Sequence, residues 1–389
     1  MARKITLLYV DAGGGHRAAA TALMDAIRIQ RRPWDVEAVC IQDVFDSVDF
    51  IQQATGIRFQ DVYNIMLRRG WTLCSAQMIR LMHGVIRMSH ARQVSAFRDY
   101  WRGTKPDMVV SLIPHFNRAI REALSDVWPD VPYITVLTDI ADYPPHFWME
   151  PMDQYVVCGS ERAERQARAI GLPEARIFRA SGMILHPRFY ENTNMNRDME
   201  RAHLGLKPDV PTGLVLFGGE GSAEMVEIAK ALRGTEPGVQ LIMLCGKNAK
   251  VAAQLRAMND APDMFVQGFT RDIPSYMALA DFFIGKPGPG SISEALSKGL
   301  PVIVRRNIRT LAHERYNADW VEEQGVGLVA RNPAGIRRAV ETILAPENCV
   351  GFRERVASVR NEAVFEIPAM LERVLETTVP EDSRVLTLV

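Results

Sequence analysis

Apolar, strand-like runs alternate with helical patterns along almost the whole chain of 389 residues, and this alternation constrains the fold more than any other feature. In the first half the runs are 5–10, 36–41, 108–112, 133–137 and 154–158, and in the second half they are 214–217, 240–245, 264–267, 282–284 and 301–304. Strands that alternate with helices usually pair in parallel, so the pattern predicts two doubly wound α/β sheets, each with its own core.

The sequence also predicts where the domains begin and end. The polar, proline-containing stretch 191–211 is typical of a linker. We therefore expect an N-terminal domain over 1–190, a C-terminal domain over 212–348 and a terminal helix over 349–376. The last residues, 377–389, are expected to be mobile.

A glycine-rich turn at 286–290 lies between an apolar run and a helical pattern, which together with the run at 301–304 predicts a βαβ unit. Free N–H groups and the dipole at such a helix start favour an anion such as a diphosphate. Glu294 lies one turn into the helix, where a carboxylate can accept both hydroxyls of a ribose. The alternative is a capping box, in which Ser291 and Glu294 satisfy backbone donors and bind nothing. The local pattern leaves both open.

A second glycine turn, Gly13-Gly14-Gly15-His16, follows the first strand-like run. It lacks the spacing of a dinucleotide fingerprint and of a Walker loop. It places the imidazole of His16 at a helix start, where its titration range suits a general base. The alternative is a histidine that caps the helix or packs against it.

Six motifs in fixed order give the chain its family resemblance. They are Gly13 to Ala20, Thr138-Asp139-Ile140, Phe217 to Gly221, Cys245 to Asn248, Gly268-Phe269 and Lys286 to Ser291. The chain resembles the group of family 28 glycosyltransferases that contains monogalactosyldiacylglycerol synthases and processive diacylglycerol glucosyltransferases. This resemblance implies a GT-B fold, with two Rossmann-like domains and a cleft between them, and a terminal helix that crosses back to the first domain. It also implies a UDP-sugar donor (glucose or galactose), a membrane-lipid acceptor such as diacylglycerol, and inversion at the anomeric carbon.

The resemblance also implies roles for individual residues. The diphosphate would lie at the 286–291 turn, the ribose on Glu294, and the uracil near the turn after the third strand of the second domain. His16 is the preferred base. Asp139 is a second candidate, or it orients the base, or it caps the turn after its strand. Lys247 is either a phosphate contact or an exposed lysine, and the second interpretation is preferred. The donor-binding set is Gly14, Gly15, Gly218, Gly219, Glu220, Gly268, Phe269, Pro287, Gly288, Gly290, Ser291, Ile292, Glu294 and Asn317, with Glu314 beside Asn317 near the sugar. For Glu314 and Asn317, helix capping or surface pairing is an equally good account.

No cofactor and no catalytic metal are expected. The sequence contains no Asp-x-Asp, the motif by which metal-dependent glycosyltransferases hold a cation beside the leaving diphosphate. A positive helix start would supply that stabilisation instead.

The segment after Thr138-Asp139 departs from the family. Plant members carry His-Pro-Thr-Trp-Phe, whereas this chain has Tyr143-Pro144-Pro145-His146-Phe147-Trp148, so the histidine is displaced. Tyr143, Phe147 and Trp148 are predicted to form an apolar wall for the acceptor, because aromatic rings suit both sugars and lipid interfaces.

The region from Arg58 to Lys105 is basic and amphipathic, and Arg80 and Arg87 share one helical arc with His83. With Trp71, Trp101 and several methionines, it predicts an element that lies on an anionic membrane surface. The alternative is a packed helical insertion with a solvated cationic face.

Composition limits the remaining functions. The net charge of zero gives no general reason to expect a nucleic-acid partner. The sequence has no apolar run near the roughly 18 residues of a membrane span, and its N-terminus does not resemble a signal peptide. Its cysteines show no C-x-x-C spacing and suit a reducing compartment. We expect a peripheral protein on the cytoplasmic face of the cell membrane.

Two other functions stay open. A UDP-sugar epimerase would share the two-domain architecture, and a non-catalytic membrane-binding module would keep the fold without the chemistry. The sequence names neither the sugar nor the lipid.

Overall fold

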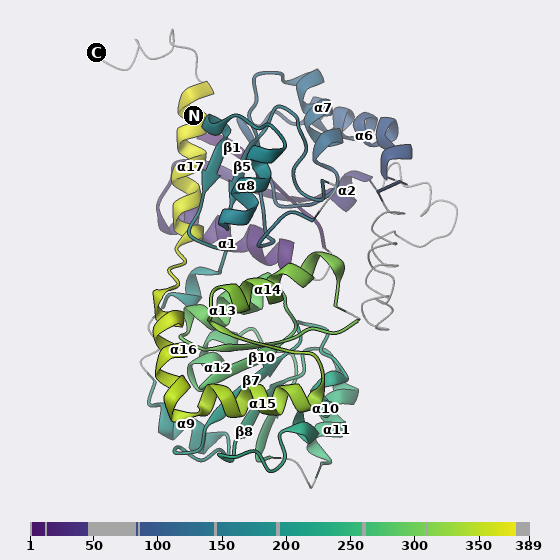
Figure 1. Cartoon of the computed structure of the whole chain (residues 1–389). Helices are drawn as coiled ribbons and strands as arrows, with labels where there is room; N and C mark the ends of the chain where they lie inside the picture. Colours follow the sequence, from purple (N-terminus) through teal and green to yellow (C-terminus); the bar gives the residue numbers. More distant parts are fainter. Residues whose placement is uncertain are drawn as a thin grey trace, which may run out of the picture. The chain divides into compact units, whose positions relative to one another are not determined.

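The computed structural model describes residues 2–11, 14–45, 83–84, 86–143, 146–191, 195–258, 262–308 and 310–378 (Figure 1). These residues form two compact units. The first unit runs to Pro187 and resumes at Glu362, and the second unit is Arg188–Asn361. Each unit contains one six-stranded sheet.

The first sheet has the order β2-β1-β3-β4-β5-β6, and its strands pair in parallel. Its strands are β1 (Arg3–Tyr9), β2 (Trp34–Cys40), β3 (Met108–Ser111), β4 (Tyr133–Val136), β5 (Tyr155–Cys158) and β6 (Ile177–Arg179). The helices of this unit are α1 (Gly15–Ile29), α2 (Ile41–Phe45), α6 (His90–Gly103), α7 (Asn117–Val127), α8 (Glu161–Ala169) and α17 (Ala363–Thr378).

Alternate side chains of the first sheet enter two different cores, because neighbouring residues of a strand point to opposite faces. Leu7 packs with α1 and α17 on one face. Leu8 packs with α6 and α7 on the other. The strands are buried on both sides, which explains why they appear in the sequence as continuous apolar runs.

The second sheet has the order β12-β11-β10-β7-β8-β9, also parallel. Its strands are β7 (Thr212–Leu216), β8 (Gln240–Leu244), β9 (Met264–Gln267), β10 (Phe282–Gly285), β11 (Val302–Arg305) and β12 (Gly327–Ala330). Its helices are α9 (Arg197–His203), α10 (Glu224–Ala231), α11 (Ala249–Arg256), α12 (Ile273–Ala278), α13 (Pro289–Ser297), α14 (Arg315–Glu323), α15 (Pro333–Leu344) and α16 (Pro346–Ser358). Helices α10, α11 and α15 cover one face, and α12, α13 and α14 cover the other.

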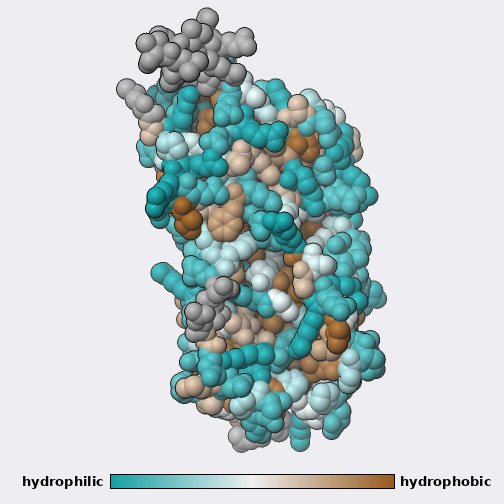
Figure 2. Space-filling model, turned by 90° about the vertical axis from the view of Figure 1, so that its left-hand side faces the viewer, coloured by the Kyte–Doolittle hydropathy of each residue, from teal (hydrophilic) through white to brown (hydrophobic). Residues whose placement is uncertain are grey.

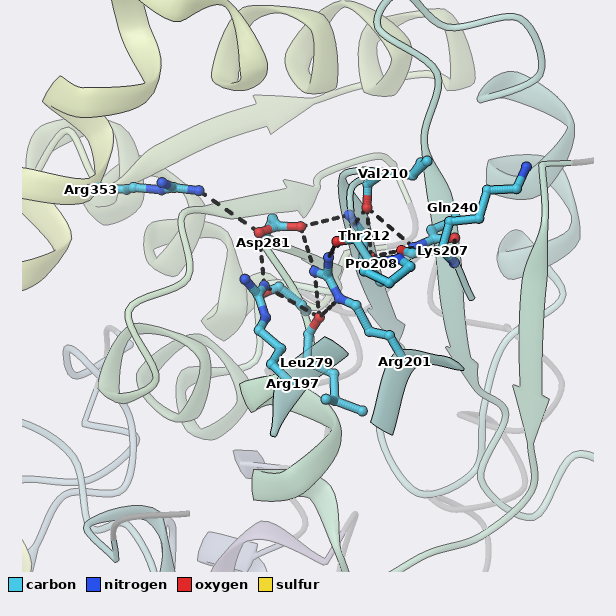
Figure 3. Close-up of polar contacts among 11 residues, drawn as sticks. Arg197, Arg201, Lys207, Pro208, Val210, Thr212, Gln240, Leu279, Asp281 and Arg353 are labelled. Carbon is cyan, nitrogen blue, oxygen red and sulfur yellow. Dashed lines mark hydrogen bonds and ion pairs between the residues drawn. The ribbon is translucent and has the colours of Figure 1, made fainter. Parts of the chain in front are cut away.

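The stretch 191–211, predicted to be a linker, instead contains α9, which is fixed to the second sheet (Figure 3). Arg197 and Arg201 each place a guanidinium nitrogen within 2.8 Å of the carboxylate of Asp281, which precedes β10. The backbone N–H of Thr212 donates to the same carboxylate at 2.8 Å. Burial alone would raise the pKa of Asp281, but these donors hold it below its usual value. The predicted linker is therefore part of the second unit.

The predicted single terminal helix over 349–376 is two helices. Helix α16 belongs to the second unit and α17 to the first. Helix α17 packs beside α1, where the side-chain amide of Gln30 donates to the carbonyl of Phe365 at 2.8 Å and Arg32 pairs with Glu372. Of the tail expected to be mobile, 379–389 lies outside the described residues.

Candidate functional site

In the second unit, β7 and β10 are neighbouring strands. The chain proceeds from β7 toward one edge of the sheet and from β10 toward the other edge. Ligands of doubly wound proteins bind at such a switch point, beyond the carboxyl ends of the strands. The turn after β7 carries Gly218 and Gly219, and the turn after β10 carries Lys286 and Gly288. The two glycine turns that the sequence predicted for the donor therefore meet at this switch point.

The turns after β7 and β8 pack directly on each other. A Cβ at Gly246 would lie 2.2 Å from the carbonyl oxygen of Gly219, so only glycine fits there. The backbone N–H of Lys247 donates to that carbonyl at 2.8 Å. The Lys247 side chain is 60% exposed and pairs with Glu220 at 3.4 Å, which agrees with its interpretation as an exposed lysine.

The turn after β9 contributes an exposed aromatic ring to the same edge. Phe269 is 56% exposed, and the Nζ of Lys247 lies 6.0 Å from the centre of its ring. A Cβ at Gly268 would lie no closer than 3.8 Å to the neighbouring turn. A flat exposed ring suits stacking against a planar base.

Helix α13 begins at Pro289 with Gly288 as its N-cap. Its first intrahelical bond runs from the N–H of Ile292 to the carbonyl of Gly288. The N–H groups of Gly290 and Ser291 therefore have no acceptor within the helix, which is the arrangement that binds anions. Ile292 was predicted to contact the donor, but its side chain is fully buried and its N–H is used inside the helix, so that prediction is wrong.

The helix start also decides between the two interpretations of Glu294. Because Gly288 is the N-cap, Ser291 is the third residue of the helix, and the capping-box interpretation of Ser291 and Glu294 is wrong. No side-chain or backbone donor among the described residues is hydrogen-bonded to the Glu294 carboxylate. Burial raises the pKa of Glu294 to about 7, although Arg188 acts in the opposite direction. The Glu294 side chain is only partly buried, so its carboxyl group, without a donor among the described residues, is still open to solvent.

Lys286, Glu314 and Asn317 fix the turn after β10. The Nζ of Lys286 lies 2.6 Å from Oε1 of Glu314, which is 6% exposed. Burial alone would raise the pKa of Glu314, but Lys286 and His313 hold it below its usual value. The side-chain amide of Asn317 donates to the carbonyl of Pro287 at 2.8 Å, and Asn317 is 1% exposed.

Asn317 therefore holds the backbone of the turn after β10. The sequence had instead placed Asn317 near the sugar. Its Oδ1 is buried with no hydrogen-bond partner among the described residues. No role was predicted for Lys286, although it is the only cation in its turn. Its pairing with a glutamate 28 positions away could not be found from local pattern.

In the first unit, His16 is the second residue of α1, at the carboxyl end of β1. Strands β1 and β3 are neighbours at the switch point of this sheet. Gly14 is the N-cap, with φ of 83°, and a Cβ at Gly14 or Gly15 would have no atom within 4 Å. Among the described residues, nothing crowds these two glycines.

The imidazole of His16 contacts the segment that follows β4. The Oγ1 of Thr138 lies 3.2 Å from Nδ1 of His16, and the ring of Trp148 lies 5.7 Å from the imidazole, centre to centre. The indole N–H of Trp148 donates to Oδ2 of Asp139 at 2.8 Å. Trp148 thus connects the two candidate residues: its ring contacts His16, and its indole N–H is hydrogen-bonded to Asp139.

The backbone of Trp148 is also hydrogen-bonded, at both its N–H and its carbonyl group. Its N–H donates to Oδ1 of Asp142 at 2.7 Å, and its carbonyl accepts from the side-chain amide of Asn117 at 2.9 Å. Phe147 and Trp148 are 6% and 1% exposed, so the prediction that they form a wall for the acceptor is wrong: both belong to the core beside His16. Tyr143, the third member of that set, is partly exposed.

The predicted membrane element is only partly described. Arg80 lies outside the described residues, while Arg87 is exposed and Met88 is 90% exposed. Trp101, predicted to face the membrane, is fully buried in α6. Arg98 on the same helix pairs with Asp126. Helix α6 therefore packs on α7, as the alternative interpretation required.

No described helix is long and apolar enough to cross a bilayer. On the face shown in Figure 2 hydrophilic side chains predominate, and apolar residues gather only in small groups.

Residues 214–346 match the family model described as the glycosyltransferase family 28 C-terminal domain. Over 358 residues the chain is 29% identical to monogalactosyldiacylglycerol synthase 2, chloroplastic, of Arabidopsis thaliana, covering 87% of this chain and 73% of that protein. It is 28% identical over 362 residues to the probable monogalactosyldiacylglycerol synthase 2, chloroplastic, of Oryza sativa subsp. japonica, with the same coverage.

Solved structures share the architecture. MurG of Acinetobacter baumannii superposes with a TM-score of 0.62 at 13% identity, covering 95% of this chain and 99% of that one. CalG4, the calicheamicin glycosyltransferase, gives 0.63 at 17% identity, with 98% and 100% covered. The UDP-GlcNAc 2-epimerase of Neisseria meningitidis, bound to UDP-GlcNAc, gives 0.61 at 13% identity, with 96% and 100% covered. The fold is GT-B.

Proposed function

We propose that this homologue of the monogalactosyldiacylglycerol synthases, which carries a glycosyltransferase family 28 C-terminal domain, moves a hexose from a UDP-sugar to a membrane lipid such as diacylglycerol. Transfer proceeds with inversion and without a catalytic metal. The observation that carries the proposal is the switch point of the second unit, where the start of α13 and the Glu294 carboxyl group occur together.

The donor is proposed to bind there in three parts. The diphosphate accepts hydrogen bonds from the N–H groups of Gly290 and Ser291 at the positive end of α13. The ribose hydroxyls donate to Glu294, which gives this partly buried carboxylate hydrogen-bond partners in the complex. The uracil stacks on or beside Phe269.

The same contacts assist the chemistry. As the bond between the anomeric carbon and the diphosphate oxygen breaks, UDP leaves with the electron pair and its charge grows. The start of α13 is already oriented toward that charge, so it stabilises the transition state more than the bound donor. Lys286 contributes a cation at the same turn.

His16 is proposed to be the general base. The lipid hydroxyl oxygen attacks the anomeric carbon from the face opposite the diphosphate, and its proton passes to the imidazole. The start of α1 disfavours an imidazolium, which keeps the ring neutral and able to accept that proton.

The acceptor is proposed to be a lipid because the relatives are named as monogalactosyldiacylglycerol synthases. The protein would reach it as a peripheral membrane protein, through the basic region that includes Arg80 and Arg87. On helix α6 the exposed Arg92 can join that contact, whereas the residues packed against α7 cannot.

The experiment is incubation with radiolabelled UDP-galactose or UDP-glucose and diacylglycerol liposomes, with and without EDTA. We expect labelled lipid from one of the two donors, at a rate that EDTA leaves unchanged. Conversion of the UDP-sugar without lipid would instead support the epimerase alternative, whose fold is the same. Vesicle binding without turnover of any donor would support a non-catalytic module.

A further inference from the structure

We propose that Thr138 is a positioning residue for the base: its hydroxyl fixes the imidazole of His16 so that Nε2, and not Nδ1, receives the proton of the acceptor. The inference rests on the proposed function, in which His16 is the base. It adds a residue to which no role has been assigned. The observation is the contact of 3.2 Å between Oγ1 of Thr138 and Nδ1 of His16.

The two residues reach this contact from different elements. His16 stands at the start of α1, after β1, and Thr138 follows β4 by two residues. Strands β1 and β4 lie on either side of β3, so their carboxyl ends open on the same edge of the sheet. The contact therefore joins two neighbouring loops of the switch-point edge, where a rigid orientation of the ring benefits catalysis.

The segment after β4 gives Thr138 a fixed position. Asp139, the next residue, accepts the indole N–H of Trp148 at 2.8 Å. Trp148 is held at its own N–H by Asp142 and at its carbonyl by Asn117. The hydroxyl thus lies on a loop anchored by a buried tryptophan, and not on a freely moving one.

A hydroxyl has a different effect on histidine from that of a carboxylate. When Nε2 takes up the acceptor proton, Nδ1 also carries hydrogen and donates it to the Thr138 oxygen. This hydrogen bond favours the imidazolium that forms during the reaction. Because the hydroxyl oxygen is neutral, this bond favours the imidazolium less strongly than a carboxylate would.

Two sets of charged groups lie near His16: Asp139, whose Oδ2 accepts the indole N–H of Trp148, and the pair Arg17 and Asp11. Arg17, the neighbour of His16 on α1, pairs with Asp11 across the turn at 3.1 Å. Both side chains of this pair are largely exposed, so solvent screens their effect on the ring.

The test uses the full-length protein and compares Thr138→Val, which keeps the shape and removes the hydroxyl, with Thr138→Ser, which keeps the hydroxyl. Thr104→Val is the matched control, because its hydroxyl bonds to the carbonyl of Tyr100 on α6. Three quantities are measured: kcat and KM for sugar transfer, the dissociation constant of UDP, and the pH dependence of diethylpyrocarbonate modification of His16, followed by mass spectrometry.

We expect Thr138→Val to lower kcat roughly 10-fold, the effect of losing one hydrogen bond to a charged group, with KM and UDP affinity unchanged. The midpoint of His16 modification should move to lower pH, because the imidazolium loses an acceptor. Thr138→Ser should restore both, and Thr104→Val should alter neither.

An unchanged midpoint of His16 modification in Thr138→Val would overturn the proposal, and so would a wild-type kcat. The modification experiment needs no turnover. If no donor and lipid react at all, which would refute the proposed function, the midpoint alone still decides whether Thr138 acts on His16.

Discussion

The Glu294 carboxyl group provides the sharpest test of the donor site. Burial raises its pKa from 4.5 to about 7, which corresponds to roughly 3 kcal/mol between the ionised and protonated forms as an upper estimate. The pKa of Glu294 is higher in the folded protein than in the unfolded chain. The loss of stability caused by ionising this carboxyl group is therefore absent below the unfolded-state pKa. It develops as the pH rises from about 4.5 to about 7. Above that range the folded protein carries an unpartnered carboxylate.

Binding of the ribose should have the opposite pH dependence. If the ionised carboxylate accepts the two ribose hydroxyls, about one molecule in ten is competent at about pH 6 and about nine in ten at about pH 8. The dissociation constant of UDP should then fall close to tenfold over this interval. The terminal phosphate of UDP titrates in the same range, so the comparison must be made against Glu294→Gln, in which only the phosphate contributes.

The assay is calorimetry of UDP and of uridine, with thermal unfolding measured in parallel. At about pH 8, Glu294→Gln should bind UDP at least tenfold more weakly, a loss of about 1.4 kcal/mol, and yet unfold at a higher temperature, because a partly buried carboxylate has been removed. Glu227→Gln is the control, since Glu227 is 60% exposed on α10. If Glu294→Gln keeps the wild-type affinity and pH dependence, the ribose assignment is refuted, whatever its stability.

Three further predictions follow from the same geometry. His16→Ala should lose sugar transfer by about 10²–10⁴-fold with near-normal UDP affinity; a near-wild-type rate would move the base to Asp139, and a variant that does not fold would make His16 structural. Substituting Arg80, Arg87 and Arg92 with Ser should release the protein from anionic liposomes at moderate salt, whereas Arg102→Ser should not, because Arg102 pairs with Asp99 on α6; equal sedimentation of both variants would remove the membrane role. Asp281→Asn should lower the free energy of unfolding by about 3–5 kcal/mol, because the buried Arg201 loses its ion pair; chemical denaturation measures this loss, and a change below about 1 kcal/mol would contradict the importance of the α9 contact.

The sequence predicted the central strands well because they are buried on both faces. It missed β6 and β12, the last strand of each sheet on one edge. Strand β6 has only 3 residues and ends on the exposed Arg179, so it gives a weak apolar signal. Strand β12, Gly327–Ala330, is a short apolar run that was not recognised as a strand.

The positions of the glycine turns could be predicted from the sequence. Gly218, Gly219 and Gly288 could be placed at strand ends from their spacing alone. The predictions for Trp101 and Trp148 were wrong. Tryptophan is a typical interfacial residue, but both of these side chains are buried by segments distant in sequence. The motif Thr138-Asp139-Ile140 gives no local sign of the contact between Thr138 and His16, because that contact spans 122 positions.

The return of α17 to the first unit affects how the chain acquires its structure during synthesis. Ile367, Leu371 and Val374 fill the core against β1 and α1, so the unit that contains His16 lacks part of its interior until the end of the chain has been made. The second unit is contiguous, from Arg188 to Asn361, and has no such requirement. The part of the protein translated first is therefore the part completed last, and a stop codon near 361 would expose the core between the first sheet and α17 while leaving the second unit intact.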